Sequence, residues 1–260
     1  MRAAGNPFIR EGIRMSFSQG AMLRSYLTMA ALLAVVCFFS WPLGSIALDA
    51  GSAGIPGTFS AVMVGLLACC AWISARSGAE GYSPETLAGL GEYATLTPVS
   101  LAALVAGKAA FGLLHTIFLL ALGVPFMIAS LAVSGVDPSR AGEALLVAGA
   151  FSFASRMLGL LLRALLGART FLVNSLLFAC GGLFLVVTIL AAPALNPITA
   201  LLRLAAAASG QAGIAAIPGA PVPFFAISVI LDLLAAILFA AGAYAALAVT
   251  RARGRAGKGV

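Results

Sequence analysis

The sequence predicts an all-α membrane protein with six transmembrane helices, an amphipathic interfacial helix at its N-terminus and both termini in the cytoplasm. Of its 260 residues, 62% are hydrophobic and only 9% are charged, against roughly 45–50% and about 25% in soluble domains. Six apolar stretches are each long enough to cross a bilayer, which takes about 20 helical residues. In hydrocarbon only a helix satisfies the backbone of such a stretch from within. This composition excludes a soluble globule, a disordered chain and a small disulfide scaffold.

The whole chain, residues 1–260, is expected to form a single transmembrane domain. Charged residues and clusters of glycine and proline separate the spans. The third span is longer than a straight crossing needs, so we expect it to protrude, to tilt or to bend at Gly123 and Pro125. The six spans cover approximately residues 26–48, 58–76, 99–133, 144–166, 170–192 and 224–249.

Residues 6–25, before the first span, have the pattern of an amphipathic helix. Asn6 and Pro7 suit its N-cap and first helical position. Apolar residues recur every four positions with a polar row beside them, which predicts a helix lying along the cytoplasmic membrane surface. A plain cytoplasmic extension of the first span is the alternative. The apolar row is Ile9, Ile13, Phe17 and Ala21, and the polar row is Arg10, Arg14 and Ser18.

The positions of lysine and arginine predict the orientation, because cytoplasmic loops carry an excess of both. With the N-terminus inside, thirteen of the fifteen basic residues lie on the cytoplasmic side, and only Arg140 and Arg203 lie on the other. Topology and contact with anionic lipid then explain the net charge of +7, and nucleic acid is not an expected partner. The thirteen are Arg2, Arg10, Arg14, Arg24, Arg76, Lys108, Arg156, Arg163, Arg169, Arg251, Arg253, Arg255 and Lys258.

The cytoplasmic connection between the second and third spans, residues 77–98, is long enough to fold on its own. It holds three of the chain's eight acidic residues. Ser83 followed by Pro84 suits the N-cap and first position of a short helix that extends to about Tyr93. Thr97, followed by a proline, predicts the start of the third span in the same way.

The external connection between the fifth and sixth spans, residues 193–223, is apolar but interrupted by five prolines. Its central part, 198–208, is predicted to be a short re-entrant or interfacial helix. Irregular backbone at membrane depth is tolerated only where it packs against protein.

The sequence lacks the motifs of catalysis. Gly107 and Lys108 occur without the earlier glycine and the following serine or threonine of a phosphate-binding loop. The single histidine has no serine motif with which it would form a nucleophile and base pair. We therefore expect no enzyme activity in this chain, and we also expect no metal and no cofactor. The cysteines are scattered over three spans and predict small buried apolar side chains. They are Cys37, Cys69, Cys70 and Cys180.

Three residues within the predicted spans are candidates for a substrate path. Burying an ionisable group in hydrocarbon costs several kcal/mol, so such a residue inside a span indicates a function. Asp232 lies about eight residues, or roughly 12 Å, into the sixth span. Pairing inside the bundle is its alternative role. For Arg156, snorkelling or pairing is favoured, and for His115 a hydrogen-bonded structural role is favoured.

The cytoplasmic connection also carries a motif: a glutamate, then a Leu-Thr-Pro-Val-Ser turn, then a Gly-Lys pair on the next helix. It resembles the permease subunits of ABC-2 type ABC transporters, although Tyr93 and Ala94 replace the usual Gly-Thr. The architecture is similar over the whole chain, including the broken segment before the last span. The matching residues are Glu92, Thr97, Pro98, Ser100, Gly107, Lys108, Pro125 and Phe126.

The resemblance implies a multi-pass subunit of a bacterial cytoplasmic (inner) membrane. It implies pairing with a separate ABC ATPase dimer, which binds ATP and magnesium, and with a second permease subunit, identical or related. In this family the helix between spans two and three is a coupling helix that docks on the ATPase. The residues expected to couple here are Glu85, Leu87, Leu90, Glu92, Tyr93, Thr97 and Pro98. A solvated loop without specific contacts is the alternative.

The predicted external loops, 49–57 and 134–143, are too short to form a substrate-binding domain, which favours export. A self-sufficient secondary carrier or channel that uses Asp232, Arg156 and His115 is the alternative function. A membrane scaffold without transport activity is disfavoured, because the coupling residues of the connection 77–98 would then have no role. A pore of the aquaporin type is also disfavoured, because it needs two paired loops and the Asn-Pro-Ile sequence occurs once.

Overall fold

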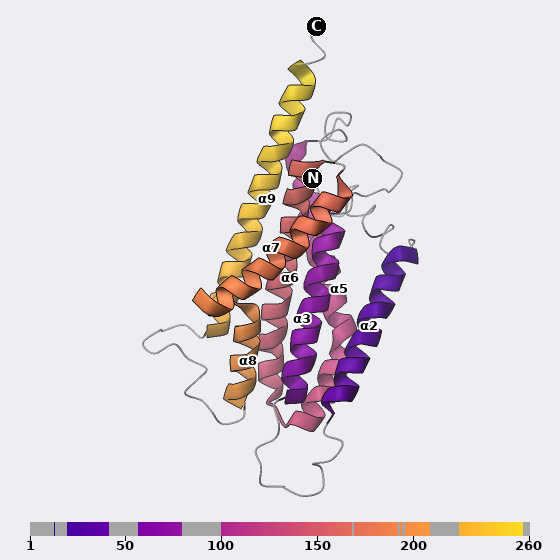
Figure 1. Ribbon diagram of the computed structural model, residues 1–260, viewed down its shortest axis with the longest axis vertical. Helices are drawn as coiled ribbons and strands as arrows, with labels where there is room; N and C mark the ends of the chain where they lie inside the picture. Colours follow the sequence, from indigo (N-terminus) through magenta and orange to yellow (C-terminus); the bar gives the residue numbers. More distant parts are fainter. Residues whose placement is uncertain are drawn as a thin grey trace, which may run out of the picture.

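The computed structural model describes residues 13, 20–41, 57–79, 100–167, 169–191, 193, 196–208 and 224–256. All regular elements within these residues are helices (Figure 1). Six of them, all except the short α8, are long and apolar enough to cross a membrane, which makes this a multi-pass membrane architecture. In chain order the helices are α2 (Gly20–Ser40), α3 (Gly57–Ala79), α5 (Leu101–Ser134), α6 (Pro138–Leu166), α7 (Thr170–Ala191), α8 (Pro197–Ala208) and α9 (Phe224–Ala256).

Helix α6 is the centre of the bundle. It packs against α3, α5, α7, α8 and α9, while α2 packs against α3 and α5. Figure 1 shows α2 and α9 at opposite edges of the bundle, with α3, α5 and α6 between them. Short connections make α5 and α6 antiparallel neighbours, and a hydrogen bond from the Thr58 hydroxyl to the Ser40 carbonyl, 2.6 Å long, ties the end of α2 to the start of α3.

Helices α3 and α6 approach each other closely because small residues line their contact. A Cβ atom on Gly159 of α6 would collide with the Ala75 carbonyl of α3. A Cβ atom on Gly78 of α3 would collide with the Arg156 carbonyl of α6. Contacts of this kind are how helices gain packing energy in lipid, where the hydrophobic effect does not drive them together.

The first span differs from its prediction, since α2 covers 20–40 and the expected span was 26–48. Its end has a local cause: Trp41 precedes Pro42, and the residue before a proline is pushed out of the helical region. Its start overlaps the predicted amphipathic helix, of which residues 20–25 belong to α2.

Three other boundaries also differ. Helix α5 begins at Leu101, and its N-cap is Ser100, whose hydroxyl accepts a bond from the Ala103 amide at 3.2 Å; Thr97 was the expected cap. Helix α6 begins six residues before the predicted 144, because Asp137 and Pro138 are its N-cap and first residue. Helix α9 continues past the predicted 249 to residue 256, and five of these seven residues are alanine or arginine, which favour helix enough to outweigh Gly254.

The short helix α8 is fixed to α7 by one buried side chain. The Asn196 side-chain oxygen accepts bonds from the Ile198 and Thr199 amides, at 2.9 and 3.1 Å, and caps α8. Its side-chain nitrogen donates to the Thr188 hydroxyl of α7 at 2.8 Å. The single Asn-Pro-Ile sequence is therefore a helix cap. Helix α8 packs with α3, α6 and α9.

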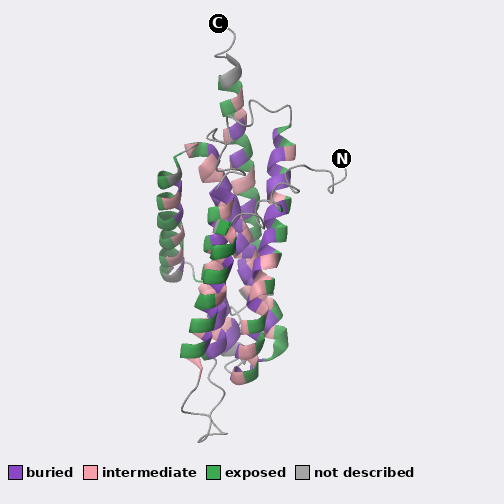
Figure 2. Ribbon diagram, turned by 90° about the vertical axis from the view of Figure 1, so that its right-hand side faces the viewer, coloured by how far each residue is buried: buried purple, intermediate pink, exposed green. Residues whose placement is uncertain are grey.

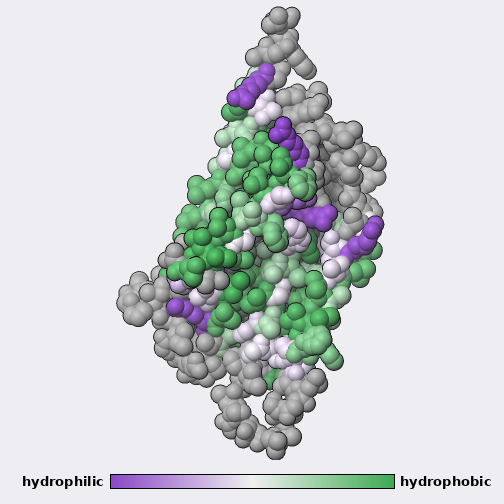
Figure 3. All heavy atoms as spheres, in the orientation of Figure 1, coloured by the Kyte–Doolittle hydropathy of each residue, from purple (hydrophilic) through white to green (hydrophobic). Residues whose placement is uncertain are grey.

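The buried residues face the interior of the bundle, and α7 stands at its edge with a largely exposed outer surface (Figure 2). Apolar residues cover most of the face shown in Figure 3, and its hydrophilic residues lie mainly toward the end where α9 stops. The basic residues of that end, among those described, are Arg24, Arg76, Lys108, Arg156, Arg163, Arg169, Arg251 and Arg253. Arg140, at the start of α6, and Arg203, on α8, lie in the other half.

Candidate functional site

Four polar side chains from four helices meet inside the bundle, close to the point where α3 ends. They are Tyr26 of α2, Ser77 of α3, His115 of α5 and Arg156 of α6, and we call them the polar network. Tyr26, His115 and Arg156 are buried, with exposed fractions of 7%, 3% and 4%. Since polar groups at this depth need partners within the protein, their mutual contacts are part of what holds these four helices in register.

Arg156 is the centre of the network. One of its terminal nitrogens, Nη1, donates to His115 Nδ1 at 2.9 Å and to the Ser77 hydroxyl at 3.1 Å. Its guanidinium carbon lies 4.9 Å from the centre of the Phe111 ring, within the range of a cation–π contact. Phe111 precedes His115 by one turn of α5, and their rings stack at 5.9 Å.

His115 is held as one tautomer by its two neighbours. A guanidinium can only donate, so Nδ1, which faces Arg156, must accept. In the neutral imidazole the proton is then on Nε2, which donates to the Tyr26 phenol oxygen at 2.8 Å. A second proton on Nδ1 would point at the Arg156 donors and break their bond, so this geometry suits an uncharged histidine.

Glycines make the space that Arg156 occupies. A Cβ atom on Gly112, on the turn of α5 before His115, would collide with the side chain of Arg156. A Cβ atom on Gly78, next to Ser77, would collide with the Arg156 backbone. The side chain therefore runs through a slot between α3 and α5 that only glycine leaves open.

Two of the three predicted substrate-path residues bond to each other. His115 and Arg156 are in direct contact, but Asp232 of α9 makes no hydrogen bond or ion pair with either of them within the described residues. Asp232 is buried, with 5% exposed, and its Oδ2 has no hydrogen-bond partner in the described part of the structure. The pairing inside the bundle that we considered for Asp232 is not found there.

The sequence does not single out three polar residues at this end, of which Tyr26 and Lys108 are buried and Ser77 is half-buried. The predicted spans place Tyr26 at the start of the first span and Ser77 in the cytoplasmic connection. The charge count places Lys108 on the cytoplasmic side, yet its side chain is buried inside the bundle, with 6% exposed. One signal was available: Lys108 and His115 are seven residues apart, which places both on the same face of a helix.

The described residues contain no group of three or more histidine, cysteine or acidic side chains that would hold a metal ion. All four cysteines are free thiols. Cys37 and Cys70 are buried as predicted, but Cys180 is exposed on α7. The groups of the polar network donate and accept hydrogen bonds with one another.

The predicted coupling residues, Glu85 to Pro98, lie outside the described residues, as does nearly all of the predicted amphipathic helix. Ile13 is its one described residue before α2 begins; it is helical and 43% exposed. Comparisons of the chain with protein-family models, with curated proteins and with solved structures give no match.

Proposed function

We propose that this protein is the transmembrane permease subunit of an ABC-2 type ABC transporter, an exporter of the bacterial cytoplasmic (inner) membrane. The observation that carries the proposal is the motif from Glu92 to Lys108, which resembles that family. Six apolar helices in a single bundle agree with such a subunit. The chain lacks a phosphate-binding loop, so the ATP and magnesium belong to a separate ATPase.

The position of the motif within the fold supports the same proposal. Residues 80–99 join the end of α3 to the start of α5, and Ser77 of the polar network is only two residues from the end of α3. A displacement of this connection by a bound ATPase would move Ser77, which bonds to Arg156 of α6, and Arg156 in turn bonds to His115 of α5. The displacement is thereby transmitted to α5 and α6 in the middle of the bundle.

The charge distribution supports an orientation with this end in the cytoplasm. Eight described basic residues lie in the half of the bundle where α3 and α9 stop, and cytoplasmic segments carry the excess of lysine and arginine. Both termini then lie in the cytoplasm, with the part of the amphipathic segment before α2, residues 6–19, on that surface of the membrane.

The proposed partners follow from this arrangement. A dimer of ABC ATPase subunits contacts residues Glu85, Leu87, Leu90, Glu92 and Tyr93, with Thr97 and Pro98 at the turn behind them. A second permease subunit, identical or related, forms the other half of the path. Neither partner is nucleic acid.

Co-expression with the ATPase encoded in the neighbouring genes tests the proposal. The tagged chain is expected to capture the ATPase, and Glu92→Ala is expected to weaken capture about tenfold, which is the effect of losing one interface anchor. Glu143→Ala is the matched control, because Glu143 lies near the start of α6, at the other end of the bundle. Capture that both variants leave unchanged would argue against a coupling role.

A self-sufficient carrier is the alternative, and the contact between His115 and Arg156 is the observation that favours it. Such a carrier would move substrate in liposomes that contain this chain alone, driven by an ion gradient. The ABC-2 proposal expects no transport until the ATPase and ATP are added. Transport without either would overturn it.

A further inference from the structure

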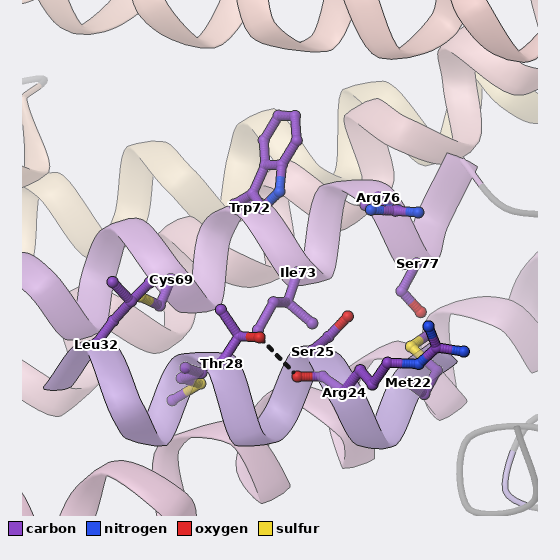
Figure 4. Close-up of a pocket in the computed structure, with 11 residues that line it drawn as sticks. Met22, Arg24, Ser25, Thr28, Leu32, Cys69, Trp72, Ile73, Arg76 and Ser77 are labelled. Carbon is purple, nitrogen blue, oxygen red and sulfur yellow. Dashed lines mark hydrogen bonds between the residues drawn. The ribbon is translucent and has the colours of Figure 1, made fainter. Parts of the chain in front are cut away.

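A groove of about 420 Å³ lies between α2 and α3 on the side of the bundle (Figure 4). Pockets of roughly 300–1,000 Å³ are the usual size for small ligands. The α2 side includes Met29 and Leu32, and the α3 side includes Cys69 and Ile73, so most of its length is apolar. From Met22 to Leu32 the groove follows α2 for ten residues, or about 15 Å.

One end of this groove is basic. Arg24 of α2 and Arg76 of α3 both line it, and both side chains are exposed. Figure 4 shows their guanidinium groups at the same end of the groove, with the Ser77 hydroxyl between them in that view. The Ser25 hydroxyl lines the same region. The groove therefore has a cationic, hydroxylated head and an apolar body.

We propose that this groove binds one anionic phospholipid. Its phosphate lies between Arg24 and Arg76, and one acyl chain runs along Met29, Leu32 and Ile73. The proposal rests on the membrane architecture alone and does not depend on an ATPase partner.

Charge and shape select this occupant. Arginine pairs with phosphate oxygens through two parallel hydrogen bonds, and basic pockets between transmembrane helices bind anionic headgroups. A soluble anion would leave the apolar body of the groove unfilled. A helix of a second copy would bury the two arginines, and the acidic side chains of the described residues are only Asp137 and Glu143, at the other end of the bundle, and the buried Asp232. An anionic lipid of the bilayer matches both parts of the groove, because its phosphate is opposite in charge to the arginines and its acyl chain is apolar like the rest of the groove.

The groove also borders the polar network. Ser77 lines the groove and accepts a hydrogen bond from Arg156 at 3.1 Å. Tyr26, which bonds to His115, directly follows Ser25 of the groove wall. A bound headgroup thus lies next to the residues that join α2, α3, α5 and α6, and lipid occupancy adds to the stability of that junction.

Tryptophan fluorescence tests the proposal, because Trp72 lines the groove. Only two tryptophans are present, and the other, Trp41, follows the opposite end of α2. The full chain carrying Trp41→Phe is reconstituted in phosphatidylcholine vesicles, with either brominated phosphatidylglycerol or brominated phosphatidylcholine as the quencher. We expect phosphatidylglycerol to quench Trp72 preferentially, and this preference to fall about fivefold for each arginine removed in Arg24→Gln and Arg76→Gln.

Two controls separate the groove from general surface charge. The double variant Arg251→Gln, Arg253→Gln removes two charges from the same end of the bundle but not from the groove, and it is expected to keep the preference. In the Trp72→Phe protein, Trp41 is expected to show no preference between the two lipids. Loss of the preference in the Arg251 and Arg253 double variant overturns the proposal.

The remaining outcomes identify other occupants. Equal quenching by both lipids in the Trp41→Phe protein means that the groove does not select an anionic lipid. Relief of phosphatidylglycerol quenching by millimolar inorganic phosphate means that the site binds free phosphate. Either result overturns the proposal of a lipid site.

Discussion

Arg156 and His115 show how a buried cation is tolerated in this bundle. The guanidinium donates to an imidazole nitrogen and a hydroxyl and lies beside an aromatic ring. These three groups stabilise its positive charge in place of water. Each side-chain bond between transmembrane helices is worth about 0.6 kcal/mol on average and up to about 1.7 kcal/mol. Because the bonds of the network share atoms, loss of one residue disturbs the others.

The phenol of Tyr26 provides a test of this network. Tyr26→Phe keeps the ring, which packs edge-on against Phe118 at 5.2 Å, but removes the oxygen that faces His115 Nε2. We expect the free energy of unfolding in mixed detergent to fall by about 0.6 to 1.7 kcal/mol. Tyr244→Phe, on the exposed face of α9, is the control and should leave stability unchanged. If the two variants unfold alike, the bond from Tyr26 to His115 contributes nothing.

At the scale of elements, the contact between α3 and α6 depends on reciprocal small residues. Ala75 and Gly78 are one turn apart on α3, and they meet Gly159 and Arg156, which are one turn apart on α6. The backbones are so close that there is no room for a side chain between them. This proximity also brings Ser77 within reach of Arg156.

A methyl group at the centre of this contact should push the helices apart. Gly159→Ala places a Cβ atom against the Ala75 carbonyl, and we expect a loss of about 1–3 kcal/mol, as for other overpacked cores. Gly142→Ala, on the same helix, is the matched control because a Cβ atom there meets nothing within 4 Å. Because alanine has a higher helix propensity than glycine, the Gly142→Ala protein should be as stable as the wild type or slightly more stable. Thermal unfolding of both variants in detergent would measure this, and a stable Gly159→Ala protein would contradict the close contact.

The start of α6 should make stability depend on pH. Asp137 caps the helix, since its carboxylate accepts a 2.9 Å bond from the Ser139 amide, and the hydrogen bonds from Ser139 are the chief cause of the lowered pKa of this carboxyl. A lowered pKa means that the charged form stabilises the fold, so the contribution is present above the unfolded-state pKa of about 3.8 and is lost as the pH falls through the folded value.

Asp137→Asn keeps an N-cap but has no charge to titrate. The difference in stability between the wild-type protein and this variant, measured across acidic pH, should shrink as the pH falls below the carboxylate range. A difference that stays constant with pH would show that the charge of Asp137 does not act on the helix.

For the whole molecule, the separation of charge between its two ends predicts the orientation. The basic residues surround the ends of α3, α6 and α9, while Arg140 is paired with Glu143 near the start of α6 at 2.8 Å. Since the count of lysine and arginine sets the orientation, the end with eight described basic residues is expected in the cytoplasm and the end with Arg140 and Arg203 outside.

Cysteine labelling in whole cells checks this orientation. In a chain whose four cysteines are replaced by alanine, Ser139→Cys and Arg253→Cys place single thiols at exposed positions at opposite ends of the bundle. A maleimide that does not cross membranes should label residue 139 in intact cells and residue 253 only after permeabilisation. Labelling of residue 253 in intact cells would reverse the proposed topology.

The sequence by itself determined the membrane class of the protein and predicted the six apolar helices found among the described residues. A run of about 20 apolar residues has one solution in hydrocarbon, so this inference needs only local information. Even the boundaries that we predicted incorrectly had local causes, since Pro42 follows the end of α2 and the Asp137-Pro138 pair starts α6.

Only the tertiary structure decided which buried polar residues meet. Arg156 is 41 residues from His115 and 79 from Ser77, and their contact depends on how far each helix is rotated about its axis. That rotation follows from where small residues on one helix meet those on another, as at Gly78 and Gly159. From the sequence, Asp232 is the stronger candidate for a substrate path and snorkelling or pairing is favoured for Arg156. Helix packing bonds Arg156 to His115, whereas Asp232 Oδ2 has no hydrogen-bond partner among the described residues. Hydropathy indicates how deep a residue lies in the membrane but not which neighbours it faces.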